Sequence, residues 1–516
     1  MKKMNLLAMS LVSAAALSFS SCSSNDDLAG GGSGNQSQVK GFYMTLAVQT
    51  PTSNGTRTSI ENPIPTEDAT AVEAAVKNGT FYLVDANGSV VFSKTLTATD
   101  WAGASGAIKD PATVAKDGKT TLKIEVENVA AGATYKVYFK AGSTPMDKVE
   151  PFAITTGTSL PGIFTADGIK QVFTAQTCAV DNDFSMFNQN DETRDGNGYT
   201  VTFTNANKEG ADNFVPAEVK YDGKTAPIKI ERVTARVDVP TSASTLTEEA
   251  LPADASAALK KAVEDAKKKV SKIELVQYAL SNVTNKTYVM QNWNKAESGW
   301  SLLIPGDATL SQTKTDFGEK YLFKDGGFKA LTGATNDYIF ENNKSDATAM
   351  YFEYKVTLDG TKFEGTADFT DGTFYRYNNV IYTSFAQILK AYADVAGLFD
   401  SKSATDLQKE LDKAKTVETG EGAKTVETKL SEFRAKYGIE VFNEGKTYYK
   451  QDITDKQLGK DVIQRNTIYR LQVNKIFNVG AQVPNGEIDK NGLFYLDVTV
   501  TVNPWVLNTQ DVTLGD

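Results

Sequence analysis

Cys22 is the residue whose neighbours define a chemical reaction most clearly. A positively charged start, Met1-Lys2-Lys3, is followed by an apolar run over residues 4–17 and by Phe19-Ser20-Ser21. This is the order of a secretory signal, because the apolar run is too short to cross a bilayer. A signal that ends in cysteine resembles a bacterial lipobox, in which the thiol is acylated, for example with palmitate. We therefore expect residues 1–21 to be a lipoprotein signal peptide and Cys22 to be the lipidated start of the mature chain. The alternative is an ordinary signal peptide followed by a chance cysteine.

The second candidate for chemistry is the peptide bond between Arg57 and Thr58. It lies in residues 51–65, a stretch rich in Pro, Gly, Asn and Ser that interrupts the regular pattern around it. Exposed loops of this composition are where proteases bind an extended backbone. A cut after Arg57 would separate residues 42–49, directly before the loop, from the rest of the chain.

Composition excludes several other kinds of chemistry. The 516 residues contain no histidine, which removes the Ser-His-Asp and Cys-His nucleophile systems and the usual zinc sites. No spacing among the 64 acidic residues singles out a glycosidase-like carboxylate pair, and the acidic stretch 181–192 has Met186 where a calcium loop needs glycine. If Cys22 carries lipid, Cys178 has no intrachain disulfide partner. We predict a protein that is not an enzyme and needs no cofactor or metal, and the net charge of -10 argues against a nucleic-acid partner.

Hydrophobic alternation predicts mainly β structure. Phe42, Met44, Leu46 and Val48 alternate with more polar residues, as in a strand with one buried face. The same pattern predicts strands at residues 79–84, 121–126, 135–139, 199–203, 228–239, 272–280, 287–290, 351–358, 446–450, 468–473 and 494–502. Two stretches rich in charged residues, 251–270 and 384–436, are predicted to be helical. The expected fold class is mainly β, with antiparallel β-sandwiches and a few helical insertions.

The chain divides where its composition changes. Residues 22–57 are expected to form a lipidated linker and a removable first strand, residues 58–240 an N-terminal β-sandwich domain, and residues 241–516 a C-terminal one that ends in a donor strand. No apolar stretch after the signal is long enough to span a membrane, so the folded parts should hang from the lipid anchor. The sequence Ala-Lys-Thr-Val-Glu-Thr occurs twice, at residues 414–419 and 423–428, which we interpret as a surface insertion.

Two strands of matching pattern stand at opposite ends of the chain. Near the C-terminus, before Pro504-Trp505, an apolar face is formed by Leu496, Val498, Val500 and Val502. One interpretation is that both strands are edge strands of two separate sandwiches. The other is exchange, in which the first strand is cut away after Arg57 and the C-terminal strand of a neighbouring copy fills the vacated groove, with Trp505 packed beside it.

Four segments of the sequence resemble one protein family. Tyr43-Met44-Thr45-Leu46 with Thr56-Arg57 resembles its first strand and cleavage loop, and Ile230-Glu231-Arg232-Val233-Thr234-Ala235-Arg236-Val237 resembles the strand that ends its N-terminal domain. Val462-Ile463-Gln464-Arg465-Asn466-Thr467-Ile468-Tyr469-Arg470-Leu471 is similar to its Arg-Asn-x-x-Tyr strand, and Val498-Thr499-Val500-Thr501-Val502-Asn503-Pro504-Trp505 to its terminal strand. The family is that of the major fimbrial subunits, or fimbrillins, of Bacteroidota type V pili, in particular the shaft pilin of the short, minor fimbriae.

This resemblance implies two transthyretin-like β-sandwich domains and a lipoprotein that a trypsin-like, arginine-specific protease cuts between Arg57 and Thr58. It also implies strand exchange into a cell-surface fimbrium that supports adhesion and colonisation. The implied partners are copies of itself, anchor and tip subunits, the lipoprotein export machinery and, through the lipid of the uncut precursor, the outer membrane. Ser23-Ser24-Asn25-Asp26-Asp27 resembles the surface-export signal of Bacteroidota lipoproteins. Two other functions stay open, namely a minor tip or anchor component and a glycan-binding surface lipoprotein.

Overall fold

The computed structural model describes residues 41–49, 67–70, 73, 78–97, 119–142, 178–181, 183–189, 198–251, 253–296, 299–311, 327–364, 371–455, 460–484 and 496–507. All of them belong to the compact unit Gly41–Asp516. The predicted lipidation site Cys22 and the predicted cleavage site at Arg57 and Thr58 lie outside the described residues. Within the described part of the chain, no helix is both long and apolar enough to cross a lipid bilayer.

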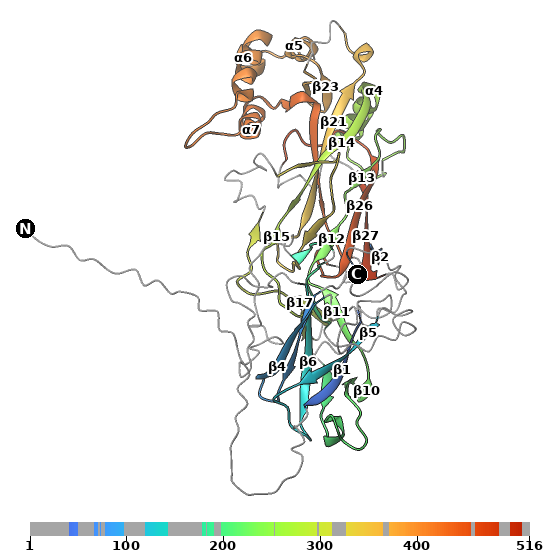
Figure 1. Ribbon diagram of the computed structural model, residues 1–516. Coiled ribbons are helices and arrows are strands. Elements are labelled where there is room, and N and C mark those ends of the chain that lie inside the picture. The colour runs from blue at the N-terminus through green and yellow to red at the C-terminus, as the bar shows by residue number, and fades with distance from the viewer. Residues whose placement is uncertain are drawn as a thin grey trace, which may run out of the picture. The chain divides into compact units, whose positions relative to one another are not determined.

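The regular structure of the described chain is mainly β, which confirms the predicted fold class (Figure 1). The largest sheet contains β1 (Phe42–Gln49), β3 (Gly79–Val84), β4 (Val90–Leu96), β5 (Lys119–Val126), β6 (Thr134–Ala141), β7 (Met186–Asn188), β8 (Tyr199–Thr202), β9 (Ala217–Tyr221), β10 (Lys224–Thr225) and β11 (Ile228–Arg232). Within the described residues its main path runs β10-β9-β1-β11-β7-β6-β3-β4, with β5 paired to β1 and β8 paired to β6 and β9. The N-terminal strand therefore lies inside this sheet and has neighbours on both sides.

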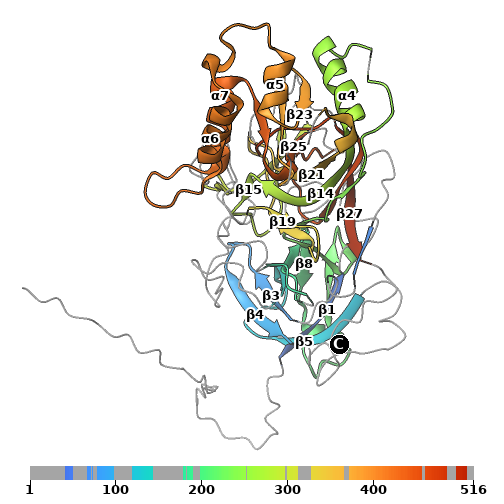
Figure 2. The same ribbon diagram turned by 90° about the horizontal axis from the view of Figure 1, so that it is seen from above.

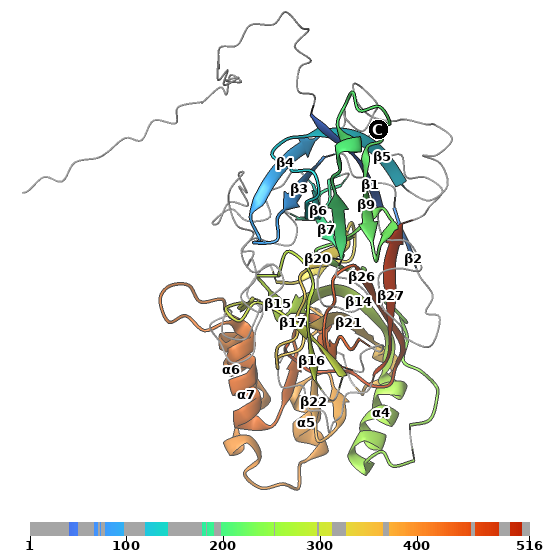
Figure 3. The same cartoon turned by 90° about the horizontal axis from the view of Figure 1, so that it is seen from below.

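A second sheet holds the C-terminal strand. It contains β2 (Glu67–Ala69), β12 (Ala235–Val237), β13 (Thr241–Ser242), β20 (Asp337–Ile339), β26 (Thr467–Ile476) and β27 (Leu496–Leu507). Its order is β2-β27-β26-β12-β20, with β13 paired to β26. Figure 3 shows β2 and β27 side by side, so the segment that follows the predicted cleavage loop borders the C-terminal strand.

A third sheet lies against the second. Its strands are β19 (Lys329–Ala330), β14 (Val270–Ser281), β21 (Ala349–Leu358) and β25 (Lys446–Asp452), in that order. One apolar cluster joins side chains of both sheets, among them Tyr278, Phe352, Tyr469 and Leu471, as in a β-sandwich. Smaller ladders pair β15 (Val283–Thr284) with β18 (Leu310–Ser311), β16 (Asn292–Ala296) with β17 (Gly299–Leu303), and β22 (Phe374–Tyr377) with β23 (Val380–Tyr382) and β24 (Glu440–Phe442). The domain boundary at residue 240 stays a prediction.

The helices fall where charged, Ala-rich sequence predicts them (Figure 2). They are α4 (Ala257–Lys269), α5 (Phe385–Ala391), α6 (Ala404–Lys415) and α7 (Val426–Tyr437), with short 3₁₀ turns η1 (Asn205–Asn207), η2 (Gly360–Lys362), η3 (Leu398–Ser401) and η4 (Asn443–Gly445). Helix α4 begins later than predicted because the hydroxyl of Ser256 accepts a hydrogen bond from the backbone N–H of Leu259 and caps the helix there. Apolar side chains of α5, α6 and α7 share one buried cluster with Tyr375 of β22.

Two strand predictions need correction. Residues 287–290 form no strand beyond an isolated bridge at Tyr288, and the backbone oxygens of Tyr288 and Val289 accept hydrogen bonds from the guanidinium group of Arg465. The strand expected at 228–239 is interrupted at residues 233–234. The chain leaves the first sheet after β11 and enters the second as β12, so each half pairs with different neighbours.

Candidate functional site

The first candidate feature is the slot that β1 occupies in the first sheet. Its whole length pairs antiparallel with β5, from Phe42 opposite Val126 to Gln49 opposite Lys119. On its other side it pairs in parallel with β9, where Met44 stands beside Ala217, and with β11, where Val48 stands beside Ile228. Loss of β1 would leave unpaired backbone groups on both walls of the slot.

The inner face of β1 belongs to the apolar core. Met44 and Leu46 are 0% exposed and Val48 is 1% exposed, and all three pack in one cluster with residues of β5, β9 and β11. Phe42 is partly buried, and its ring lies 5.6 Å from the ring of Phe203 in an edge-to-face contact. Phe42, Met44, Leu46 and Val48 therefore form one apolar face of β1, as the alternation predicts.

The outer face of β1 carries an aromatic and charged cluster. The ammonium group of Lys123 lies 4.5 Å from the ring centre of Tyr43 and 4.8 Å from that of Phe214. The hydroxyl of Tyr43 donates a hydrogen bond of 3.3 Å to Glu209. Loss of hydration raises the pKa of Tyr43, and the nearby carboxylates of Glu125 and Glu209 raise it further. The end of the Tyr43 side chain thus faces negative charge, while its ring faces a cation.

The second candidate feature is the C-terminal strand, β27. It pairs antiparallel with β26, so that positions 496, 498, 500 and 502 stand opposite Ile476, Val473, Leu471 and Tyr469. The ladder with β26 ends at Pro504, and from Trp505 to Leu507 the strand pairs in parallel with β2. Proline has no N–H to donate, which suits the end of a ladder. In this structure the predicted donor strand is therefore paired within its own chain.

A buried ion network anchors the segment that follows the predicted cleavage loop. Arg236 donates to the carboxylate of Glu73 at 3.0 Å, and Tyr338 donates to it at 2.9 Å. Arg232 donates twice to the backbone oxygen of Glu73, at 3.1 and 2.9 Å. Burial raises the pKa of Glu73, but the charge of Arg236 and the hydrogen bonds from Thr70 and Tyr338 outweigh it, so the net pKa is lowered.

Two of the segments quoted for the family resemblance meet beside this network. Arg232 donates to the side-chain oxygen of Asn466 at 3.1 Å, and the N–H of Asn466 donates to the backbone oxygen of Thr234 at 2.8 Å. Arg236 stands beside Ile468 where β12 and β26 pair in parallel. The sequence therefore identified two segments that touch, but it gave no sign of Glu73, whose partners lie 163 and 265 residues away along the chain.

A second ion pair lies fully inside the protein. Arg465 is paired with Glu341 at 2.8 Å, and these side chains are 0% and 1% exposed. The same guanidinium group also donates to Thr287 at 2.8 Å. Burial raises the pKa of nearby Glu231 to about 8, an effect that Arg465 opposes and Glu341 reinforces. Burial thus favours the neutral form of the Glu231 carboxyl in the folded protein.

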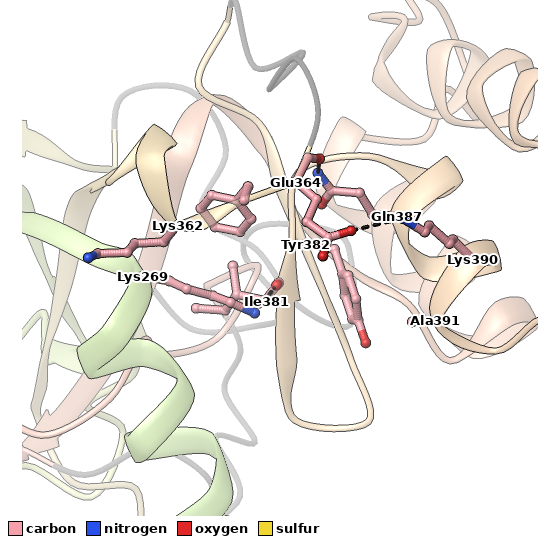
Figure 4. Close-up of a pocket in the computed structure, with 9 residues that line it drawn as sticks. Lys269, Lys362, Glu364, Ile381, Tyr382, Gln387, Lys390 and Ala391 are labelled. Atoms are coloured by element: carbon pink, nitrogen blue, oxygen red, sulfur yellow. Dashed lines mark hydrogen bonds and ion pairs between the residues drawn. The ribbon is translucent and has the colours of Figure 1, made fainter.

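A cavity of about 410 Å³ lies between α4, η2, β23 and α5 (Figure 4). Lys269 donates to the backbone oxygen of Ile381 at 2.7 Å, pairs with Asp265 at 2.8 Å, and lies 5.5 Å from the ring centres of Phe363 and Tyr382. On the other side of the cavity Lys390 and Glu364 form an ion pair, drawn as a dashed line in Figure 4. The contacts of Lys269 with Ile381 and Tyr382 hold helix α4 to the β22–β23 hairpin. Two of the lysines that line the cavity, Lys269 and Lys390, have carboxylate partners.

Comparison with known proteins bears directly on the C-terminal part of the chain. Residues 440–511 match the family model described as "Major fimbrial subunit protein type IV, Fimbrillin, C-terminal". This range contains β24 to β27, and with them the predicted donor strand. The predicted resemblance to the fimbrillins is thereby confirmed, and residues 440–511 are the fimbrillin-like part of the chain. No curated protein matches the sequence as a whole.

Several solved structures are similar to this one. The fimbrilin (fimA) of Porphyromonas gingivalis W83 has 14% identity and a TM-score of 0.39, with 91% of this chain and 99% of that chain covered. The tip fimbrial protein Mfa3 of Porphyromonas gingivalis, with C-terminal truncation, has 12% identity and a TM-score of 0.32, with 90% and 100% covered. A fimbrial assembly protein of Parabacteroides distasonis has 10% identity and a TM-score of 0.25, with 62% and 99% covered. The resemblance to the fimbrillins rests on the family match over residues 440–511 and not on these values.

Proposed function

We propose that this chain is the structural shaft subunit of a surface fimbrium, exported as a lipoprotein through Cys22, cut after Arg57 and polymerised by donor-strand exchange. The observation that supports it best is the place of β1. This strand precedes the predicted cleavage loop in the sequence, yet it lies inside the first sheet with partners on both sides. A single cut in the loop leaves β1 held by non-covalent contacts alone.

The energetics favour replacement of β1 over an empty slot. Without the strand, the ladder partners on β5, β9 and β11 lose their hydrogen bonds, and the core cluster around Leu46 meets water. Four apolar side chains of an incoming strand would recover about 1.5 to 3 kcal/mol each, roughly 6 to 12 kcal/mol together, before the cost of ordering the strand. An exposed groove of this kind therefore draws in a strand of matching pattern.

The arrangement leads to an open filament. The slot lies in the first sheet, whereas the predicted donor, β27, lies in the second. Because donor and acceptor are different surfaces, the contact between copies is heterologous, and repetition extends a fibre instead of closing a dimer. In this proposal the partners are further copies, anchor and tip subunits, the export machinery and a trypsin-like protease, and the lipid holds the uncut precursor at the outer membrane.

The competing functions have weaker support. A glycan-binding surface lipoprotein would expose an aromatic platform, but the exposed large apolar side chains of the described residues are Val180, Val215, Val395 and Val417. A tip or anchor component would lack either the donor strand or the cut, and the chain offers a sequence for both. A structural role, without catalysis, therefore suits it best.

One proteolysis experiment tests the proposal. Limited digestion of the purified precursor with trypsin should yield filaments in electron microscopy, and N-terminal sequencing of the filaments should give Thr58 as the first residue. A lysine-specific protease can cut after Lys40, which leaves β1 attached, so it should give no filaments from the wild type. The same protease should produce filaments from Arg57→Lys. Filaments that begin upstream of Phe42 would show that β1 is retained and would refute the proposal.

A further inference from the structure

The first strand and the end of the chain share more than an alternating pattern. Residues 42–49 are Phe-Tyr-Met-Thr-Leu-Ala-Val-Gln, and residues 494–501 are Phe-Tyr-Leu-Asp-Val-Thr-Val-Thr. Phe, Tyr and Val recur at the first, second and seventh positions, and the third and fifth positions are aliphatic in both. Residues 494 and 495 lie outside the described part of the chain, so they enter here by their sequence alone.

We infer that residues 494–501 of a second copy replace β1 residue for residue, with Phe494 at the position of Phe42 and Asp497 opposite Lys123. This inference rests on the proposed strand exchange and adds the direction and the register of the incoming strand. The donor then runs in the direction of β1, antiparallel to β5, the wall that pairs with β1 over its whole length.

The inner face of the slot fits this register. Leu496, Val498 and Val500 take the positions of Met44, Leu46 and Val48, which are the fully buried positions of β1. Phe494 takes the position at which Phe42 contacts the ring of Phe203. A slip by one residue would turn every apolar side chain to the outer face, so the serious competitors are slips by two.

The charges of the outer face distinguish the register from a slip by two. Lys123 stands directly opposite Thr45 on β5, so Asp497 at position 45 would face a cation across the ladder. Glu218 stands beside Thr45 on β9, but its carboxylate accepts a hydrogen bond of 2.6 Å from Thr225 on β10, which flanks β9 on the side away from β1. On the wall that pairs with β1 over its whole length, position 45 therefore stands opposite a cation.

A slip by two residues in either direction creates an unfavourable contact, namely repulsion between like charges in one direction and overpacking in the other. With Leu496 at the position of Phe42, Asp497 would stand at position 43, directly opposite Glu125 on β5 and on the side where Tyr43 now donates to Glu209, and like charges directly opposite destabilise a ladder. With Leu496 at the position of Leu46, Phe494 would enter the fully buried position of Met44 and overpack it. In the inferred register Tyr495 instead returns a phenol to those two carboxylates and a ring to Lys123.

Peptide competition tests the register without changing the C-terminal strand of the precursor, which pairs with β26. A synthetic peptide of residues 492–503 should inhibit assembly of the full-length precursor triggered by an arginine-specific protease, which cuts neither peptide. An Asp497→Lys peptide should inhibit about tenfold less well, because an attractive cross-strand pair becomes a repulsive one. With Lys123→Asp precursor the order of the two peptides should reverse. Circular dichroism of the uncut variant checks that it folds.

The outcomes separate the register from the proposed function. A slip that puts Asp497 at position 43 would make the Asp497→Lys peptide the better inhibitor of the wild type, and equal inhibition by both peptides would likewise overturn the pairing with Lys123. Failure of the wild-type peptide to inhibit at all would refute residues 494–501 as the occupant. In each case the dependence of assembly on the cut after Arg57 is measured separately, and it alone decides the proposed function.

Discussion

Replacement of Leu46 by alanine should weaken the precursor and leave the mature filament unchanged. Leu46 is 0% exposed in the core of the first sheet. Loss of a fully buried leucine side chain costs about 2 to 5 kcal/mol, the sum of its transfer free energy and the cavity left behind. The urea midpoint of the uncut Leu46→Ala precursor, followed by circular dichroism, should fall accordingly. After cleavage the residue has left the subunit, so the urea midpoint of filament dissociation, followed by sedimentation, should equal that of the wild type.

Ile230→Ala provides the matched control. Ile230 is also 0% exposed and belongs to the same core cluster, but it lies on β11 and remains after the cut. This variant should lower the midpoint of the precursor and that of the filament alike. The reasoning is refuted if Leu46→Ala filaments dissociate as early as Ile230→Ala filaments, because β1 would then still be part of the mature subunit.

Three further predictions concern burial, pH and export. Arg465→Met should destabilise the precursor by about 3 to 5 kcal/mol in urea unfolding, because it leaves Glu341 buried without its partner, whereas Lys390→Met, at an exposed ion pair, should have no measurable effect. The pKa of Glu231 is raised from 4.5 to about 8 in the folded protein, so between these pH values the unfolded chain has lost a proton that the folded chain keeps. The stability of the wild type should therefore fall as the pH rises from about 4.5 to about 8. The urea midpoint of Glu231→Gln should fall less over this range, and equal pH profiles of the two proteins would contradict the raised pKa of Glu231. Cys22→Ala should yield precursor that no longer partitions with membranes, and normal surface filaments from this variant would rule out the lipoprotein route.

The alternation of apolar and polar residues predicted the strands well where one face of a strand is buried. The strand at Gly79–Val84 was predicted with its observed bounds, and the apolar face of β1 consists of the residues that alternation selects. The last strand extends past the predicted end at residue 502 to Leu507, because β2 pairs with it beyond Pro504. A three-residue strand such as β2 has no period long enough to recognise in a sequence.

Contacts between distant residues could not be predicted in this way. Residues 287–290 have the composition of a strand, but a guanidinium group 176 residues further along the chain binds the backbone oxygen of Val289. Glu73 is one acidic residue among 64, and nothing beside it in the sequence marks it as the centre of a buried network. The peptide segments that the family resemblance singled out were informative because two of them meet at this network.

The two-residue break between β11 and β12 has a mechanical consequence. Only Val233 and Thr234 separate the strand that lines the slot from the strand that pairs with β26, and an extended residue spans at most about 3.6 Å. A pull applied at the slot therefore reaches the second sheet with almost no slack in the connection. The contacts of Arg232 with Glu73 and Asn466 bridge the same point, so tension there acts on several bonds in parallel. Under load, such a subunit would behave as a stiff link in a fibre rather than as a spring.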